Sequence, residues 1–430
     1  MVIELLQKLT RSESSILLLG SKHADLLQPL HPSRCLVIEP DPNKVAQAKD
    51  QHPDLDIEVG NEELAPRIGP FDYVLILENV IRWEDIHTTL ESYRRWVGPE
   101  TQLIFTLPNV GLQWLKSHSS KAQNWVSKQD LRNLLKLADF KIDREGSFRW
   151  SPYLVASAAP RPQARKALTC SVIIPTRNEV GNIDSCVSRV PQMGAGTEIV
   201  FVDGSSTDGT VEAIERAIGE NPDKNIRLIH QLEPTEEFSE ATQRELNRVH
   251  KLGKMLPQGK ADAVRKGFRA ATGDVLMILD ADLTVVPEDL PRFFEQIATG
   301  RGDFINGVRL LYPQEEQAMQ PVNLLGNTFF GFALSWLMGQ TIKDSLCGTK
   351  VFFKKDYDAI MRIEETLGDF DPFGDFELLF GAAKARLRIV DFPVHYGRRV
   401  AGQPKIETYR HGLKLFRMLW YGFLLFKVRQ

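Results

Sequence analysis

Three features that would place a protein in a special class are missing from this sequence. Its four cysteines, at positions 35, 170, 186 and 347, are scattered, so neither a disulfide framework nor a zinc site is indicated and a reducing cytoplasm is favoured. No stretch reaches the roughly 18–20 apolar residues of a membrane-spanning helix. The start, Met1-Val-Ile-Glu4, carries an early acid and does not resemble a signal peptide.

A strong charge of one sign is also missing. The net charge of −3 does not indicate a nucleic-acid-binding surface, so we expect no nucleic-acid partner. The 43% hydrophobic and 25% charged composition is that of a globular protein, and 430 residues suffice for two or three domains.

The first part of the chain, residues 1–156, alternates strand and helix signals. Apolar runs typical of buried strands occupy residues 15–20, 35–39, 71–77 and 103–107, with helical patterns between them. This alternation predicts βαβ units and therefore an α/β, Rossmann-like, doubly wound sheet.

The order of these features resembles a class I methyltransferase that uses S-adenosylmethionine. Glu39 stands where that family ends its second strand in an acid that holds the ribose of the cofactor. The family's first loop is glycine-rich so that the backbone can approach the cofactor, whereas here Gly20 is the only glycine in residues 20–25. Gly60-Asn61 replaces an acid that the family often places beside the adenine. We therefore expect a degenerate domain that acts as a scaffold or partner surface; a bifunctional protein that still methylates is the alternative.

Three further segments follow. Residues 157–168 are small, proline-bearing and basic, which predicts a linker. A second domain is expected over residues 169–405 and an amphipathic tail over 406–430. The tail mixes apolar and aromatic residues with Lys and Arg, and it is suited either to a membrane interface or to packing on the second domain or a second copy.

Two buried strands of the second domain end in polar motifs. The strand 170–174 runs into Pro175-Thr-Arg-Asn-Glu179, and the strand 198–202 runs into Asp203-Gly-Ser-Ser-Thr-Asp208-Gly-Thr210. Asp203 at such an end can accept hydrogen bonds from a ribose or a base edge. Asp208 either joins such a site or caps the helix that follows.

The stretch Val275–Thr284 carries the strongest chemical signal. Five apolar residues predict a buried strand that runs into Asp280-Ala281-Asp282. In an extended chain residues i and i+2 point to the same side, so both carboxylates can converge on one cation. Oxygen ligands suit Mg2+ or Mn2+, which would bridge to a diphosphate; an ordinary acidic turn is the alternative.

Together with the segment 259–267, these motifs resemble a family 2 glycosyltransferase of the dolichol-phosphate mannose synthase-like branch. The resemblance implies a GT-A fold, a nucleotide-sugar donor at the strand ends, and metal ligands Asp280 and Asp282. Thr284 departs from the branch, which often has a Gln there as a further metal ligand. The catalytic residues implied are Asp280, Asp282, Asp375 and Arg398. The residues implied around the donor are Pro175, Thr176, Arg177, Glu179, Asp203, Ser205, Lys260, Arg265, Asp280, Ala281, Asp282, Arg309, Arg398 and Lys405.

The resemblance also bears on the acceptor. Asp344-Ser-Leu-Cys-Gly-Thr-Lys350 resembles an element of the lipid-phosphate-utilising branch, so Asp344, Lys350 and Arg399 are the acceptor residues that it implies. Asp375 and Glu377 stand where family members with hydroxyl acceptors keep a catalytic base. The loop 398–405 resembles one that folds over the donor and meets phosphates with basic side chains.

We therefore predict metal-dependent transfer of a sugar, with inversion, from a nucleotide donor to a polyprenyl phosphate at the cytoplasmic face of the membrane. The alternatives are a hydroxyl acceptor on a cell-surface glycan and a non-catalytic scaffold. An acceptor phosphate is already ionised at neutral pH, so Asp375 would then orient groups instead of removing a proton. The nucleotide, the sugar and a possible homo-oligomer are left open.

Overall fold

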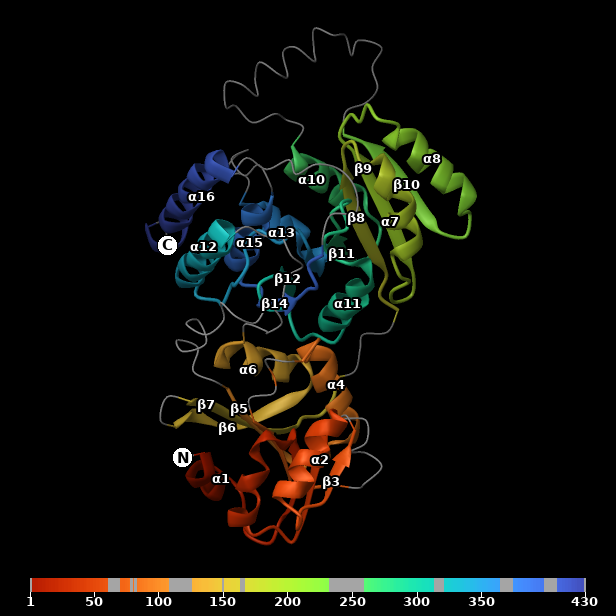
Figure 1. Ribbon diagram of the computed structural model, residues 1–430. Helices are drawn as coiled ribbons and strands as arrows, with labels where there is room; N and C mark the ends of the chain where they lie inside the picture. Colours follow the sequence, from red (N-terminus) through yellow and green to blue (C-terminus); the bar gives the residue numbers. More distant parts are fainter. Residues whose placement is uncertain are drawn as a thin grey trace, which may run out of the picture. The chain divides into compact units, whose positions relative to one another are not determined.

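The computed structural model describes residues 2–60, 70–77, 80, 83–107, 126–148, 151–162, 167–231, 259–312, 321–363, 374–397 and 408–428 (Figure 1). The chain divides into two compact units. The first is Met1–Arg161 with Leu311–Pro313, and the second is Pro162–Leu310 with Gln314–Gln430. Each unit contains a seven-stranded sheet, so the α/β architecture predicted for both parts of the chain is confirmed.

The sheet of the first unit has the strand order β3-β2-β1-β4-β5-β7-β6. The first five strands are parallel, β7 runs antiparallel to them, and β6, which is antiparallel to β7, forms the edge. The strands are β1 (Ser15–Leu19), β2 (Arg34–Glu39), β3 (Ile57–Val59), β4 (Tyr73–Leu77), β5 (Gln102–Thr106), β6 (Phe140–Phe148) and β7 (Ser151–Ala158). The helices are α1 (Val2–Leu9), α2 (Pro42–Gln51), α4 (Ile86–Trp96) and α6 (Lys128–Leu137), with 3-10 turns η1 (Ser21–Leu26) and η2 (Gln28–Leu30).

Both faces of this sheet are buried. Leu17 and Leu19 of β1 belong to the core beneath α4 and α6, whereas Ile16 and Leu18 belong to the core beneath α1 and α2. Because side chains alternate along a strand, a strand that is apolar at every position needs helices on both faces of its sheet. The doubly wound arrangement predicted for residues 1–156 is therefore confirmed.

The predicted start of the linker is wrong by two residues. β7 continues through Ser157 and Ala158, and Ser157 pairs with Gln102 on β5 and with Lys141 on β6. β7 lies between two strands and is hydrogen-bonded on both sides as far as Ser157. The small side chains of this segment alone did not reveal the pairing.

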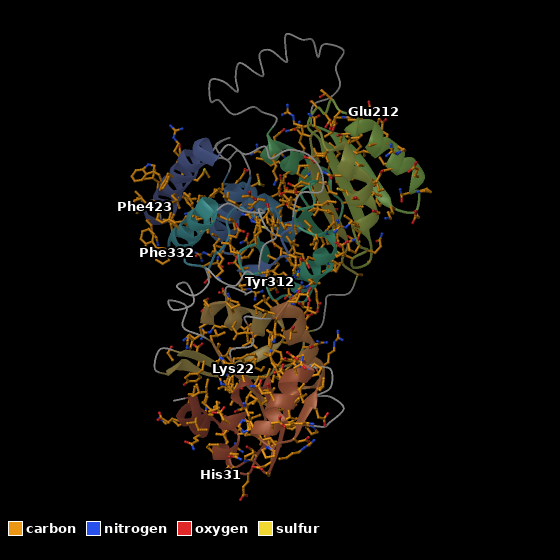
Figure 2. The ribbon with its side chains drawn as sticks, in the orientation of Figure 1. Lys22, His31, Glu212, Tyr312, Phe332 and Phe423 are labelled. Carbon is orange, nitrogen blue, oxygen red and sulfur yellow. The ribbon has the colours of Figure 1, made fainter. Side chains whose placement is uncertain are left out.

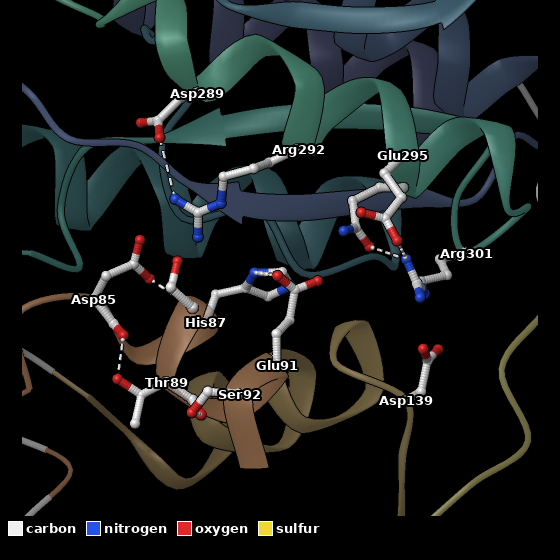
Figure 3. Close-up of polar contacts among 12 residues, drawn as sticks. Asp85, His87, Thr89, Glu91, Ser92, Asp139, Asp289, Arg292, Glu295 and Arg301 are labelled. Atoms are coloured by element: carbon white, nitrogen blue, oxygen red, sulfur yellow. Dashed lines mark hydrogen bonds and ion pairs between the residues drawn. The ribbon is translucent and has the colours of Figure 1, made fainter. Parts of the chain in front are cut away.

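The first unit also contains a short segment from far along the chain, which the sequence did not lead us to expect. Leu311 and Tyr312 are buried in its core. The Tyr312 hydroxyl donates to Asp85 Oδ1 at 2.8 Å (Tyr312 is labelled in Figure 2). Asp85 caps α4, accepting from the Thr88 amide on the same oxygen at 2.9 Å and from the Thr89 hydroxyl on its carbonyl at 2.8 Å (Figure 3).

The sheet of the second unit has the order β10-β9-β8-β11-β13-β12-β14, in which only β13 runs antiparallel to its neighbours. The strands are β8 (Cys170–Thr176), β9 (Thr197–Asp203), β10 (Asn225–His230), β11 (Val275–Ile278), β12 (Phe304–Val308), β13 (Lys350–Phe353) and β14 (Ile389–Pro393). The α-helices are α7 (Ile183–Arg189), α8 (Thr210–Glu220), α10 (Lys260–Ala270), α11 (Leu290–Ala298), α12 (Pro321–Met338), α13 (Tyr357–Met361), α15 (Asp375–Lys384) and α16 (Thr408–Phe423). Short turns are η5 (Val180–Asn182), η6 (Pro287–Asp289), η7 (Lys354–Asp356) and the π-helical η8 (Leu424–Val428).

The last helices of the second unit share an apolar core. Leu334 and Leu337 of α12, Phe376 and Phe380 of α15, and Met418 of α16 form one buried cluster. Within the described parts of the chain, we find no helix with the length and apolar character needed to cross a bilayer.

Candidate active site

One edge of the second sheet gathers the polar strand ends. Because β8, β9, β11 and β12 are parallel to one another, their carboxyl ends meet at the same edge, where the antiparallel β13 begins. Thr176, Asp203, Asp280, Arg309 and Lys350 therefore stand at or next to this edge. Ligands of open α/β sheets bind at such an edge, so the predicted site residues are brought to a suitable place.

The loops after β8 and β9 hold each other in place. The Asn178 amide donates to the Ser206 hydroxyl at 2.9 Å, and the Thr207 amide donates to Asn178 Oδ1 at 2.8 Å. The Glu179 amide donates to the Thr210 hydroxyl at 2.9 Å. The two predicted motifs thus form one rigid surface at the strand ends.

The hydrogen bonds of Asp208 bear on whether this residue joins a ligand site or caps the helix that follows. Asp208 Oδ1 accepts from the amide and hydroxyl of Thr210 at 3.1 and 2.5 Å, and Oδ2 accepts from the Val180 amide at 3.2 Å. Burial would raise the pKa of Asp208, but these hydrogen bonds outweigh it and lower the pKa. Asp208, although exposed, therefore bonds to both loops, whereas the N-cap residue of α8 is Gly209.

Asp203 has a different environment. Its side chain is 2% exposed, and its Oδ2 accepts from the Ser206 amide at 3.2 Å. Its Oδ1 is buried, and no hydrogen-bond donor for it exists among the described residues. A buried acceptor of this kind usually has a partner, so the geometry suits a ligand that donates a hydrogen bond, such as a ribose hydroxyl or a base N–H.

The other residues predicted near this end fall into two groups. Thr176 and Glu179 are buried and bonded within the protein: the Thr176 hydroxyl donates to the Val202 carbonyl at 3.3 Å, and Glu179 Oε2 accepts from Asn182 Nδ2 at 2.7 Å. The side chains of Pro175, Arg177 and Ser205 are at least partly exposed to solvent.

Asp280 and Lys260 form the centre of the site. Lys260 Nζ lies 2.5 Å from Asp280 Oδ1. Burial would lower the pKa of Lys260, but the negative charges of Asp280, Asp375 and Asp282 outweigh it and raise the pKa. The ammonium is thus bonded to Asp280, and the charges of Asp282 and Asp375 also act on it.

Gly348 closes one side of this centre. A methyl group on Gly348 would overlap Asp280 Oδ2 and would lie 2.9 Å from Lys260 Nζ. The close approach of the backbone to Asp280 thus requires a residue without a side chain.

Asp282 is held by the residue two positions later. Its Oδ1 accepts from the Thr284 amide at 3.1 Å and from the Thr284 hydroxyl at 2.8 Å. Thr284, which departs from the family pattern, therefore orients this carboxylate. Ala281 is buried between the two acids, and its carbonyl accepts from the Cys186 thiol at 3.8 Å.

The donor set fits a divalent cation. Asp280 and Asp282 both act on one ammonium group, so a cation between them would meet carboxylate oxygens, the ligands that Mg2+ and Mn2+ prefer. The described residues contain no group of three or more His, Cys, Asp or Glu side chains arranged for a metal. Water and ligand oxygens would have to complete the coordination shell.

Three buried ion pairs stand beside this centre. Arg309 binds Asp344 through two parallel bonds, from Nε at 2.7 Å and Nη2 at 2.8 Å. Arg265 Nη1 donates to Glu377 at 3.2 Å. Lys350, which is fully buried, lies 3.6 Å from Asp375 Oδ1.

These ion pairs bear on the ligand contacts expected of Arg309, Asp344 and Arg265. Burial would raise the pKa of Asp344, but the Arg309 guanidinium outweighs it and keeps the pKa below the ordinary value. Arg309 and Asp344, which the resemblance assigned to donor and acceptor, are thus bound to each other, and Arg265 is bound to Glu377. Their predicted contacts with ligands stay predictions.

Arg398, Arg399 and Lys405 lie outside the described residues, as does the whole loop 398–405. The chain just before it is fixed. Tyr396 pairs with Val285, and the Gly397 amide donates to the Thr284 carbonyl at 2.9 Å. The loop therefore leaves from a point adjoining the segment that holds Asp282.

Asp391 was not predicted. Asn306 Nδ2 donates to its Oδ1 and the Lys343 amide to its Oδ2, both at 2.7 Å. Burial raises the pKa of Asp391 to about 7 despite these bonds. A single acid inside the apolar strand Ile389-Val-Asp-Phe-Pro393 is the signal that could have revealed it.

In the first unit, Glu39 stands at the end of β2, as predicted. Its Oε2 accepts from both the amide and the hydroxyl of Ser21 at 2.9 Å, and its Oε1 accepts from the Asp41 amide at 3.3 Å. The chain itself thus supplies the partners that a ribose would supply. Asn61 lies outside the described residues.

Part of the chain matches a model of a known protein family. Residues 171–241 and 233–362 match the family model described as Glycosyl transferase family 2. Dolichol-phosphate mannosyltransferase of Pyrococcus furiosus is 29% identical over 59% of this chain and 64% of its own length. Undecaprenyl-phosphate 4-deoxy-4-formamido-L-arabinose transferase of Pseudomonas fluorescens is 26% identical over 58% and 63%. The chain thus spans less than two thirds of the length of these relatives.

Two solved structures align with part of the chain. The mannosyltransferase PcManGT of Pyrobaculum calidifontis, solved with GDP-Man and Mn2+, aligns over 63% of this chain and 67% of its own at a TM-score of 0.39 and 20% identity. Magnesium protoporphyrin IX methyltransferase of Synechocystis, solved with bound SAH, aligns over 37% and 80% at a TM-score of 0.30 and 19% identity.

Proposed function

We propose that this protein transfers a sugar, with inversion, from a nucleotide-sugar donor to a polyprenyl phosphate, using a divalent cation, because residues 171–362 match the model of glycosyl transferase family 2. The observation that carries the proposal is the centre formed by Asp280, Asp282 and Lys260. It combines two carboxylates that fit a cation with a basic side chain that fits a phosphate.

In this proposal Asp280 and Asp282 hold Mg2+ or Mn2+, which neutralises the charge that develops on the leaving diphosphate. Thr284 keeps Asp282 oriented, and Gly348 leaves room for Asp280. The unpartnered Oδ1 of Asp203 receives a hydrogen bond from the nucleoside, and Arg398 with Lys405 contributes positive charge to the phosphates. All of these groups bind and orient the donor while its glycosidic bond breaks.

A polyprenyl-phosphate acceptor is supported by the names of the two relatives and by the state of the acids beside the centre. Asp375 lies near Lys350, and Glu377 is bound by Arg265. A carboxylate that is stabilised by a cation is a weak base, whereas a phosphate oxygen needs no base because it is ionised already.

A hydroxyl acceptor is the second candidate, since Asp375 and Glu377 stand at the start of α15 near the centre. The double variant Asp375→Asn with Glu377→Gln separates the two acceptors. With a phosphate acceptor the loss in kcat should be modest. With a hydroxyl acceptor it should be on the order of a hundredfold or more, the value of a general base.

The membrane surface is the place where such an acceptor is found, and the second unit has a face suited to it. We define the aromatic face as the exposed side chains Phe329, Phe332 and Trp336 of α12 with Phe416 and Trp420 of α16. Phe329 and Phe416 rings lie 6.0 Å apart, and Lys427 Nζ lies 4.8 Å from the Trp336 ring centre. Figure 2 labels Phe332 and Phe423 on these two helices.

Exposed aromatic rings bordered by basic side chains are typical of segments that lie in a membrane interface. We infer peripheral binding at the cytoplasmic face of the membrane, with a second copy of the chain as the competing occupant. The variant Phe332→Glu with Trp420→Glu should lose co-sedimentation with anionic vesicles. Val59→Glu, which changes an exposed apolar residue of the first unit, should keep it.

The proposed activity is tested by incubating the full chain with labelled nucleotide sugars, Mn2+ and a polyprenyl phosphate. Label in the lipid fraction, lost when the metal is chelated, is the expected result. Transfer only to a soluble sugar alcohol would refute the lipid acceptor. Retention of donors without transfer or hydrolysis would favour a non-catalytic scaffold.

A further inference from the structure

Lys260 has a contact that donor binding alone does not explain. It is the first residue of α10, yet its ammonium reaches Asp280 at the end of β11, at 2.5 Å. A residue that serves only the phosphates of a donor would be expected to point toward the space that they fill. Here it is bonded to one of the two acids that the proposed metal requires.

Among the described residues, the groups acting on this ammonium are acids. Three carboxylates, Asp280, Asp375 and Asp282, act on it electrostatically, and Gly348 lies against both it and Asp280. Asp375 has a second cation nearby, because Lys350 lies 3.6 Å from it. Asp280 is thus the carboxylate that depends most directly on Lys260 for neutralisation.

A divalent cation held by Asp280 would compete with the ammonium for the same carboxylate. Two positive charges on the same carboxylate repel each other, so the ammonium must leave Asp280 when the cation arrives. The diphosphate of a donor would offer the ammonium a new anionic partner next to the metal. Cation and donor would then favour each other's binding, because each relieves a cost imposed on the other.

We propose that Lys260 is a resident counter-ion of the acidic centre, which competes with the divalent cation for Asp280 until a nucleoside diphosphate draws it away. Metal binding is thereby coupled to donor binding. This inference rests on the proposed function. It adds that the free protein binds the metal weakly because Lys260 neutralises Asp280. Tight binding of the metal then requires the donor as well.

The test measures Mn2+ binding to the full chain by the loss of the electron paramagnetic resonance signal of free Mn2+, first without nucleotide. Lys260→Met should bind Mn2+ roughly tenfold more tightly than the natural protein, within the usual range of coupling between sites. Lys260→Arg, which keeps the charge, should behave like the natural protein. Lys355→Met is the matched control, because it removes an equal charge from an exposed position after β13, at the opposite edge of the sheet.

The same titrations are then repeated with saturating GDP or UDP. The natural protein should gain affinity for Mn2+ by more than Lys260→Met does, so the advantage of the variant should shrink or reverse. Equal Mn2+ affinity of the natural protein and Lys260→Met, without and with nucleotide, would overturn the inference and leave the proposed function intact. Absence of Mn2+ binding in every variant, with nucleotide present, would overturn both.

Discussion

The two units place an acid at equivalent positions and treat it differently. Glu39 is the last residue of β2, which is parallel to the neighbouring β1. Asp203 is the last residue of β9, which is parallel to the neighbouring β8. Glu39 accepts three hydrogen bonds from its own chain, two of them from Ser21. Asp203 keeps one buried oxygen without a donor among the described residues.

This difference teaches how a shared fold loses or keeps a site. The strand order brings an acid to the crevice in both units, but the loop after the first strand decides what the acid can bind. In the first unit Ser21 fills the role of a ligand. In the second unit the loops after β8 and β9 bond to each other and leave Asp203 to a ligand.

The largest expected effect is the loss of sugar transfer when an acid of the second unit is removed. Asp280→Ala or Asp282→Ala should each lower sugar transfer by on the order of a hundredfold or more, because the leaving diphosphate loses its counter-charge. Glu39→Gln, at the saturated strand end of the first unit, should leave transfer unchanged. Rates of label transfer measure this, with circular dichroism as the control for folding. Full turnover by the double Ala variant of the second unit would show that these acids hold no essential cation.

The buried Arg309–Asp344 pair of the second unit is expected to contribute more to stability than an exposed ion pair. Arg309→Met leaves the buried Asp344 carboxylate without its cation, so the free energy of unfolding should fall by about 3–5 kcal/mol. Arg216→Met removes the exposed partner of Asp184 and should cost at most about 1 kcal/mol. Urea unfolding gives both values. Equal costs would mean that the buried pair contributes no more than a surface pair.

Asp391 predicts a pH dependence confined to the second unit. Its folded pKa of about 7 lies above the unfolded value, so its stabilising contribution is complete at low pH and is lost as pH rises from about 4 to about 7. The difference in unfolding free energy between the natural protein and Asp391→Asn should therefore fall between pH 4 and pH 7, by at most about 1.4 kcal/mol per pH unit. A difference that stays constant over this range would contradict the raised pKa.

The smallest effect concerns the lock on Glu39. Ser21→Ala removes one of the two Ser21 bonds to this carboxylate and keeps the amide, so the first unit should lose about 1 kcal/mol of stability. Ser92→Ala, whose hydroxyl donates to a neutral carbonyl on α4, should cost less. Urea unfolding, monitored by hydrogen exchange of amides in the first unit, measures the stability of both variants. An unchanged stability in Ser21→Ala would mean that Glu39 is not held by this hydroxyl.

Local patterns explain what could be predicted from the sequence. The apolar runs and the i, i+2 spacing of Asp280 and Asp282 identified both sheets and the acidic strand end, because these depend on periodicity over a few residues. Partners far apart in sequence could not be predicted. Lys260 meets Asp280 and Arg309 meets Asp344 only after the strands assemble, so their basic members were interpreted as ligand contacts.

Tyr312 illustrates the same limit at the level of the fold. Its own surroundings in sequence, Leu310-Leu311-Tyr312-Pro313, do not distinguish a core segment of the second unit from one of the first. Its burial with Asp85 and α4 follows from tertiary packing. The roles of Arg398, Arg399 and Lys405 rest on the family resemblance, and they stay predictions.

The central claim is that Glu39 of the first unit is held by its own loop, whereas the acids of the second unit, Asp203, Asp280 and Asp282, bind a donor and a cation. Titration calorimetry of the full chain tests it most directly, first with S-adenosylmethionine and then with a panel of nucleotide sugars plus Mn2+. We predict no binding of S-adenosylmethionine and binding of at least one nucleotide sugar, abolished by Asp280→Ala. Micromolar binding of S-adenosylmethionine, or donor binding that survives Asp280→Ala with Asp282→Ala, would contradict the claim.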